Sequence, residues 1–193
     1  MRKSAGTQPL SAVVMGIQDN MDSYYQNVGS RIDAEKPQPW FHPGQLQAWN
    51  SYKPVILVLA GRQSGKTVMA PWLTLREVQR RFEKDAPNDH LVVSPSFTLA
   101  SSKLIPEYIR VFVKELKLCT FSQDPVRELR FTREGVMRLT GQPEGEIVIR
   151  FGYAKNSDSL ESATYKSVVM DECGQVAFSV KSDEAIDGRL TTT

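Results

Sequence analysis

The sequence predicts an α/β fold with a mainly parallel central sheet and an antiparallel addition. Two observations carry this prediction. Between residues 55 and 118, short apolar segments rich in β-branched residues alternate with longer segments of helical pattern, and such alternation is typical of a parallel sheet with helical crossovers. Between residues 127 and 154, three short alternating segments follow one another, which is typical of an antiparallel meander.

The composition is that of a globular protein of ordinary size. A chain of 193 residues with 40% hydrophobic and 24% charged residues can bury a substantial core. Its net charge of +2 is too small to indicate a nucleic-acid partner by itself. The two cysteines give no disulfide framework, and no window approaches the apolar length of a membrane span. We therefore expect a cytoplasmic location and no membrane association.

Residues 1 to 36 are expected to form an N-terminal helical arm. Apolar side chains from Val14 to Ile32 recur at helical spacing, which predicts an amphipathic helix between residues 11 and 32. That helix could pack on its own domain or dock a partner. The proline-rich segment EKPQPWFHPG then leads into the main domain, which we place at residues 37 to 193.

The first half of the main domain reads as two strands, each followed by a helix. VILVLA at residues 55–60 has the length and β-branched content of a buried strand. A helix should follow from about Gly65 to Phe82, although Pro71 lies inside it and cannot donate a backbone hydrogen bond. HLVVSPS (90–96) is the second strand. Residues 98–118 are expected to be mostly helical, with Pro106 as the candidate point for a break.

The second half reads as strands only. RELRFT, GVMRLT and GEIVIRFGYA are the three expected strands of the meander, separated by short turns that contain glycine. Near the end of the chain, Val168 to Met170 form a further buried strand within YKSVVMDECGQ.

The segment between the first strand and the first helix has the order of a phosphate-binding loop. Residues 60–67 read AGRQSGKT, the Walker A pattern with alanine in place of the first glycine. Glycines let backbone amides point at phosphates, and the start of a helix adds a partial positive charge. A glycine turn capped by lysine and threonine is the alternative. We assign nucleotide binding to the whole loop: Ala60, Gly61, Arg62, Gln63, Ser64, Gly65, Lys66 and Thr67.

Three side chains of this loop have specific expected roles. Lys66 should reach the β- and γ-phosphates, and the Thr67 hydroxyl should ligate Mg²⁺. Arg62 could sense the γ-phosphate or stabilise charge in the transition state. An exposed loop arginine is the alternative for Arg62.

Two acids follow the last apolar strand. Asp171 would lie beside the phosphate loop if the two strands that precede these features were parallel neighbours, and it would hold Mg²⁺ through water. Glu172 would activate or orient the attacking water. Solvated acids at a strand end are the alternative. Together, the loop and the acidic pair predict a three-layer P-loop NTPase fold of the ASCE, RecA-like type, with ATP and Mg²⁺ as cofactors.

These motifs resemble those of a known family. The chain resembles the ATPase domain of the large terminase subunit of tailed bacteriophages, the motor that packages DNA into proheads. The similar stretches are WFHPGQLQAW, AGRQSGKT, LVVSPSFTLASS and FGYAKNSDSLESATYKSVVMDECGQ, which together span residues 40 to 175. Ser162 departs from the family pattern, which often has glycine at that position.

The resemblance implies further roles. Gln45 would hydrogen-bond adenine, with Gln47 as a rival for that role, and Arg62 would act in cis near the γ-phosphate. Glu172, Arg62 and Lys66 would form the catalytic set, and Thr67 and Asp171 the metal site. The implied partners are double-stranded DNA, the portal protein and the small terminase subunit. The chain would form a homo-oligomeric ring when assembled, or a monomer in isolation, in the host cytoplasm.

Two alternative functions remain open from the sequence. A helicase-type P-loop motor also uses an upstream glutamine and an Asp-Glu pair. An isolated fragment could instead be a non-catalytic nucleotide-binding or assembly module. Because the sequence given stops at DGRLTTT, before the nuclease domain that the family normally carries, we expect no nuclease activity from this chain.

Basic residues outside the loop are not assigned to a site. One group lies on the helix after the loop and another in the expected meander, and either could touch DNA or complete a neighbouring subunit's site. Solvated faces are the alternative reading. These residues are Arg76, Arg80, Arg81, Lys84, Arg127, Arg130 and Arg133, and the histidines His42 and His90 have no metal-ligand spacing.

Overall fold

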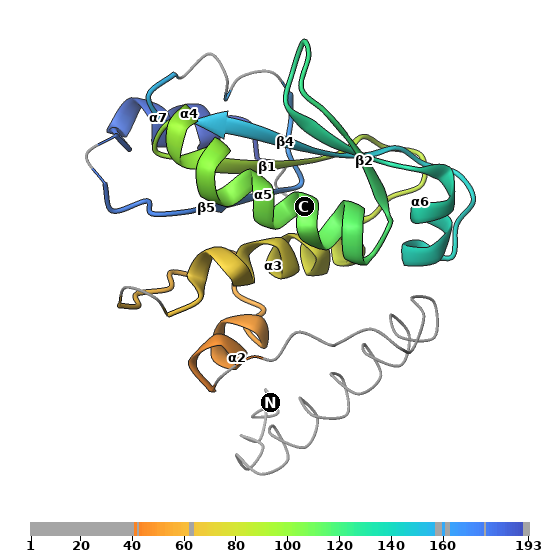
Figure 1. The fold of residues 1–193 in the computed structure, drawn as a ribbon, viewed down its shortest axis with the longest axis horizontal. Helices are drawn as coiled ribbons and strands as arrows, with labels where there is room; N and C mark the ends of the chain where they lie inside the picture. The colour runs from red at the N-terminus through yellow and green to blue at the C-terminus, as the bar shows by residue number, and fades with distance from the viewer. Residues whose placement is uncertain are drawn as a thin grey trace, which may run out of the picture. The chain divides into compact units, whose positions relative to one another are not determined.

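The computed structural model describes residues 41, 43–61, 64–156, 160, 163–175 and 177–190, and Figure 1 shows its ribbon. The chain divides into two compact units, Met1–Pro54 and Val55–Thr193. In the first unit, the short helix α2 (Pro43–Trp49) is followed by a segment without regular secondary structure. The ring of Phe41 lies 5.2 Å from that of Trp49, whose side chain is buried. The helix expected between residues 11 and 32 lies outside the described residues.

The second unit is built on a mixed sheet of five strands in the order β2-β3-β4-β1-β5. β1 pairs in parallel with β4 and β5, whereas β3 pairs antiparallel with β2 and β4. The predicted α/β class with an antiparallel addition is therefore confirmed, but the sheet is mixed rather than mainly parallel. The strand bounds are β1 Asn88–Ser94, β2 Cys119–Ser122, β3 Glu128–Phe131, β4 Ile147–Tyr153 and β5 Ser167–Met170.

Helices lie on both faces of this sheet. On one face, Leu91 and Val93 of β1 share a buried cluster with Ile186 of α7 (Val180–Asp187). On the other face, the ring of Tyr108 meets that of Phe151 edge-on at 5.4 Å. Figure 1 shows the helical segment of Tyr108 in front of the sheet and α7 behind it. Because β1 is covered from both sides, it is buried along most of its length, and Leu91, Val92 and Val93 form its apolar centre.

The two predicted helices of the main domain are confirmed. α3 spans Lys66–Arg81 and continues through Pro71. The next helical segment is continuous through Pro106. π-Helical turns lie on both sides of the short α-helical part that contains Pro106, and the Ile105 amide donates to the Ala100 carbonyl five residues earlier. Wider turns of this kind accommodate a residue that disturbs the regular hydrogen-bond ladder. Its parts are α4 Phe97–Leu99, η1 Ala100–Leu104, α5 Ile105–Tyr108 and η2 Ile109–Glu115.

The prediction that GVMRLT is a strand is wrong. Residues Arg133–Thr140 form helix α6 instead. The Thr132 side chain caps its start by accepting a hydrogen bond from the Gly135 amide at 2.9 Å, and Gly141 ends it in a left-handed conformation with φ of 75°. A threonine cap and a terminal glycine are strong helix signals, and they override the short alternating pattern.

The prediction that residues 55–60 form a buried strand is also wrong. The segment is not a strand, and Val55, Leu57 and Leu59 are 83%, 67% and 86% exposed. A buried strand needs a neighbour for its backbone groups, and no described strand pairs with this segment. The backbone next to β5 pairs with a different segment. The Tyr165 amide, just before β5, donates to the Arg189 carbonyl at 2.7 Å, and Tyr165 forms a parallel bridge with Leu190.

No helix within the described ranges is both long enough and apolar enough to span a membrane.

Candidate nucleotide site

The candidate site lies where β5 ends and α3 begins. β1, β4 and β5 run in parallel, so their carboxyl ends share one edge of the sheet. Asp171 directly follows β5, and its amide donates to the Val93 carbonyl of β1 at 2.9 Å. This bond holds the backbone of Asp171 at the sheet edge, in the position that the sequence pattern predicted.

α3 begins within the predicted phosphate-binding pattern, at Lys66. Gly65 precedes the helix with φ of 76°, a left-handed conformation that favours glycine. Its carbonyl accepts the Met69 amide at 3.0 Å and so closes the first turn. Since the first amides of a helix have no partner within it, they are available to an anion.

The two predicted metal-binding side chains lie together. The Thr67 hydroxyl donates to Oδ2 of Asp171 at 3.2 Å. Burial raises the pKa of the Asp171 carboxyl; the hydrogen bond from Thr67 opposes this rise, and the nearby charge of Glu172 adds to it. A partly buried carboxylate held next to a hydroxyl has lost water ligands that a cation could replace.

This pair of oxygens fits Mg²⁺ rather than a metal enclosed by protein ligands. Magnesium prefers oxygen donors and usually keeps several waters while it binds one or two protein groups and substrate phosphates. In the described part of the chain, no group of three or more histidines, cysteines and acids could hold a metal ion. A hydroxyl and a carboxylate beside the predicted phosphate loop are therefore a donor set compatible with a metal–nucleotide complex.

Lys66 bonds to its own loop. Its Nζ donates to the carbonyls of Ala60 and Gly61, both at 2.7 Å, and to Oγ of Ser64 at 3.3 Å. An ammonium group has three donors, so these contacts use its full capacity. The lysine thus lies across the loop that the sequence assigned to phosphates.

Glu172 has an unusual backbone. Its φ of 54° lies in the left-handed region, which is uncommon for a residue with a long side chain. Gln175 contacts it twice: its side-chain Nε2 donates to Oε2 of Glu172, and its amide donates to the Glu172 carbonyl at 3.1 Å. Gln175 was not among the predicted site residues. Its position three residues after Glu172, in a turn that contains glycine, was the signal available.

The remaining predicted site residues lie in the first unit or outside the described residues. Gln45 and Gln47 lie on α2, in the first unit, with Gln45 partly buried and Gln47 exposed. Arg62 and Gln63 lie outside the described residues. The adenine-reading and arginine roles therefore stay predictions.

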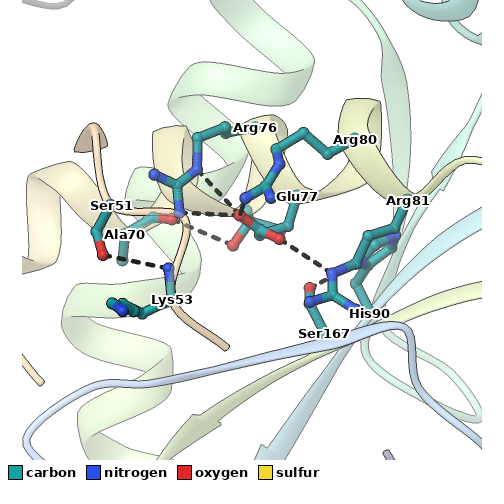
Figure 2. A network of polar contacts seen from close by, with 10 residues as sticks. Ser51, Lys53, Ala70, Arg76, Glu77, Arg80, Arg81, His90 and Ser167 are labelled. Atoms are coloured by element: carbon teal, nitrogen blue, oxygen red, sulfur yellow. Dashed lines mark hydrogen bonds and ion pairs between the residues drawn. The ribbon is translucent and has the colours of Figure 1, made fainter. Parts of the chain in front are cut away.

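The arginines of α3 are held by one acid. Figure 2 shows Arg76, Arg80 and Arg81 gathered around the Glu77 carboxylate, at distances of 2.8, 3.0 and 3.1 Å. Burial raises the pKa of the Glu77 carboxyl, but the arginines outweigh burial and lower it overall. These arginines form ion pairs with an acid of their own helix, and Arg76 is buried rather than on a solvated face.

The fold and site thus describe an α/β domain in which a hydroxyl, an acidic pair and a lysine meet at one sheet edge. The family model described as "Terminase large subunit, T4likevirus-type, N-terminal" matches residues 57–193. The chain belongs to this terminase large-subunit family. Neither the curated proteins nor the solved structures include a match to the chain.

Proposed function

We propose that this chain is the ATP-binding and ATP-hydrolysing motor domain of a terminase large subunit, with a P-loop NTPase fold, and that it powers the packaging of double-stranded DNA into a prohead. The single observation that carries the proposal is the hydrogen bond of Thr67 to Asp171, at 3.2 Å. It supports a joint role for the start of α3 and the end of β5, the two segments that bear the phosphate-loop and acidic motifs. Family membership supports the packaging role.

In this proposal, each residue of the site acts on one part of the reaction. Lys66 leaves its loop carbonyls and binds the β- and γ-phosphates, while the helix amides after Gly65 face the phosphate oxygens. Thr67 and Asp171 hold Mg²⁺, which supplies positive charge to the phosphates when bound. Glu172 orients the attacking water and accepts its proton. Arg62 stabilises the γ-phosphate charge, and Gln45 binds adenine.

The proposed partners follow from family membership. They are double-stranded DNA, the portal protein and the small terminase subunit, with several copies of the large subunit in a ring in the host cytoplasm. Oligomerisation would add groups that a single copy lacks, such as an arginine from a neighbouring subunit.

One observation favours a second candidate for the chain on its own. The segment that leads into the phosphate loop is exposed at Val55, Leu57 and Leu59 and lacks a described strand partner. A loop whose leading strand is not fixed in a sheet is less well preorganised, so the isolated chain could bind nucleotide without hydrolysing it.

Steady-state ATP hydrolysis and ATP affinity, measured for the wild type and Glu172→Gln, test both candidates. Glu184→Gln, an exposed acid on α7, is the matched control. The motor proposal expects the wild type and the control to turn over ATP, and Glu172→Gln to bind ATP while turnover falls by a factor of about 10² or more. Binding without turnover in all three proteins would favour the nucleotide-binding module. Absence of ATP binding by the wild type would contradict both.

A further inference from the structure

An exposed aromatic ring lies beside an arginine at the sheet edge that also carries Asp171. Phe97 begins α4, three residues after β1 ends at Ser94, and is 50% exposed. The guanidinium carbon of Arg127 lies 4.1 Å from the centroid of the Phe97 ring. At this distance, the cation is attracted to the face of the ring.

Arg127 is held in place by three elements. Its carbonyl accepts the Phe151 amide of β4 at 3.1 Å, and its Nη1 donates to Oγ of Ser101 at 2.5 Å. Tyr153, at the end of β4, packs edge-on against Phe97 with ring centroids 5.4 Å apart. Burial raises the pKa of the Tyr153 hydroxyl, and the charge and hydrogen bond of Arg127 oppose that rise. The guanidinium is thus fixed before any ligand arrives.

Arg127 differs from nearby arginines in its charge balance. Arg130, on β3, pairs with Glu128 at 2.7 Å and with Glu146. Arg150, on β4, pairs with Asp89 and with Glu128, both at 3.2 Å. Among the residues that the structure describes, no carboxylate pairs with Arg127; its polar and ring contacts are neutral. A fixed arginine with its charge uncompensated is suited to a phosphate.

We propose that Phe97, Arg127 and Tyr153 form a contact for the sugar–phosphate backbone of double-stranded DNA. Arg127 binds one phosphate, and the exposed Phe97 ring packs against the neighbouring deoxyribose. The choice of DNA as the ligand rests on the proposed function. In the sheet register, Tyr153 lies opposite Ser94, and Met170 opposite Val93. The contact therefore lies on the same edge as the acidic pair, two strands away.

The test is equilibrium binding of a double-stranded oligonucleotide across a series of salt concentrations, without nucleotide. For each phosphate that a protein cation neutralises, the slope of log K against log salt changes by about 0.9. Arg127→Ala is expected to weaken binding several-fold and to reduce this slope by about 0.9. Arg127→Lys should keep the slope, because it keeps the charge. Phe97→Ala should weaken binding with the slope unchanged.

Arg130→Ala is the matched control, since Arg130 lies on β3, the strand that directly follows Arg127, but is already paired with acids. It should leave the slope unchanged, and thermal melting of each variant verifies folding. The proposal is overturned by an unchanged slope in Arg127→Ala, by an equal loss in Arg130→Ala, or by absence of wild-type binding to double-stranded DNA at low salt. Because DNA binding and ATP turnover are measured separately, a failure of the DNA-contact proposal and a failure of the hydrolysis proposal are seen in different experiments.

Discussion

Thr67 and Asp171 lie 104 positions apart in the chain, yet the threonine hydroxyl donates to the aspartate carboxylate at 3.2 Å. The bond joins the first turn of α3 to the carboxyl end of β5. It also holds a carboxylate in a partly buried position, where its charge is disfavoured.

Asp171→Asn should therefore stabilise the free chain at neutral pH. Burial raises the pKa of the Asp171 carboxyl, so the folded state holds its proton more tightly than the unfolded state. The wild type then loses stability as pH rises through the window above the ordinary aspartate pKa, and regains it as pH falls. Melting temperatures of wild type and Asp171→Asn across pH should differ most near pH 7 and converge in acid.

The exposed Asp85, changed to asparagine, is the control for general charge effects. A neutral-pH melting temperature of Asp171→Asn below that of the wild type would contradict the prediction. In the same samples, Asp171→Asn should lose Mg²⁺-dependent nucleotide binding, since the variant lacks the charged oxygen that the proposal gives to the metal.

Lys66→Ala should loosen the phosphate loop even when no nucleotide is present. The Lys66 ammonium bonds to the carbonyls of Ala60 and Gly61, so its removal frees both. Backbone amides of the described loop residues 60, 61, 64 and 65 should then exchange hydrogen faster, by about a factor of ten for the loss of roughly 1.4 kcal/mol of local stability. Lys53→Ala, on an exposed segment of the other unit, is the control. Equal exchange rates in Lys66→Ala and the wild type would show that these bonds do not hold the loop.

Gln175→Ala should slow catalysis without weakening ATP binding. Gln175 donates to one carboxylate oxygen of Glu172 and thereby fixes its side chain. If Glu172 orients the attacking water, loss of this hydrogen bond should lower kcat by about tenfold, while KM for ATP stays near the wild-type value. Gln175→Asn, which keeps the amide, should recover part of the rate. A rise in kcat would mean that Gln175 restrains Glu172 instead.

Patterns that depend on neighbouring residues could be predicted from the sequence. β1 and β5 each contain a short run of β-branched and apolar residues, and α3 begins after a glycine and carries a periodic apolar face. The sequence also placed Asp171 at the carboxyl end of β5, but it put the predicted phosphate loop beside Asp171 only if residues 55–60 formed a parallel neighbour of β5, and these residues are not a strand.

Features that depend on tertiary pairing could not be predicted. The apolar run at residues 55–60 has the composition of a strand, but composition does not say which edge it pairs with. In contrast, the strand prediction for the residues of α6 failed for a local reason. Their alternating polar and apolar residues suggested a strand, but the Thr132 cap and Gly141 at the end favour a helix. The sequence named Arg127 among several basic residues that could touch DNA, but it could not distinguish Arg127 from Arg130, because their different pairing depends on residues from separate elements.

Gly135→Ala should be among the most destabilising single changes in the chain. A Cβ at Gly135 would lie 2.1 Å from the carbonyl oxygen of Leu118, a backbone atom that cannot rotate away. Overpacking against fixed atoms costs about 3 kcal/mol. Gly174→Ala is the control, because a Cβ there meets nothing within 4 Å. Urea unfolding of both variants should show a large loss of stability for the first and little change for the second; similar values would contradict the packing seen around α6.

His90 should make the fold sensitive to acid. Its Nδ1 lies 2.7 Å from Oγ of Ser167, and its buried Nε2 has no hydrogen-bond partner among the described residues. Figure 2 shows the two side chains. A neutral ring that donates from Nδ1 suits these surroundings, because protonation would add an unpaired N–H. Burial lowers the pKa of His90 from 6.5 to about 4; the Glu77 charge opposes this, and Arg81 and Lys166 add to it.

The direction in which stability changes with pH follows from the lowered pKa of His90. Between pH 6.5 and about 4, the unfolded state binds a proton at His90 that the folded state does not, so stability falls as pH falls through this window. The full loss is on the order of 3 kcal/mol. Urea unfolding at a series of pH values should show this fall in the wild type, and His90→Gln, which cannot titrate, should show a flatter profile. Parallel profiles for the two proteins would mean that other groups cause the acid sensitivity.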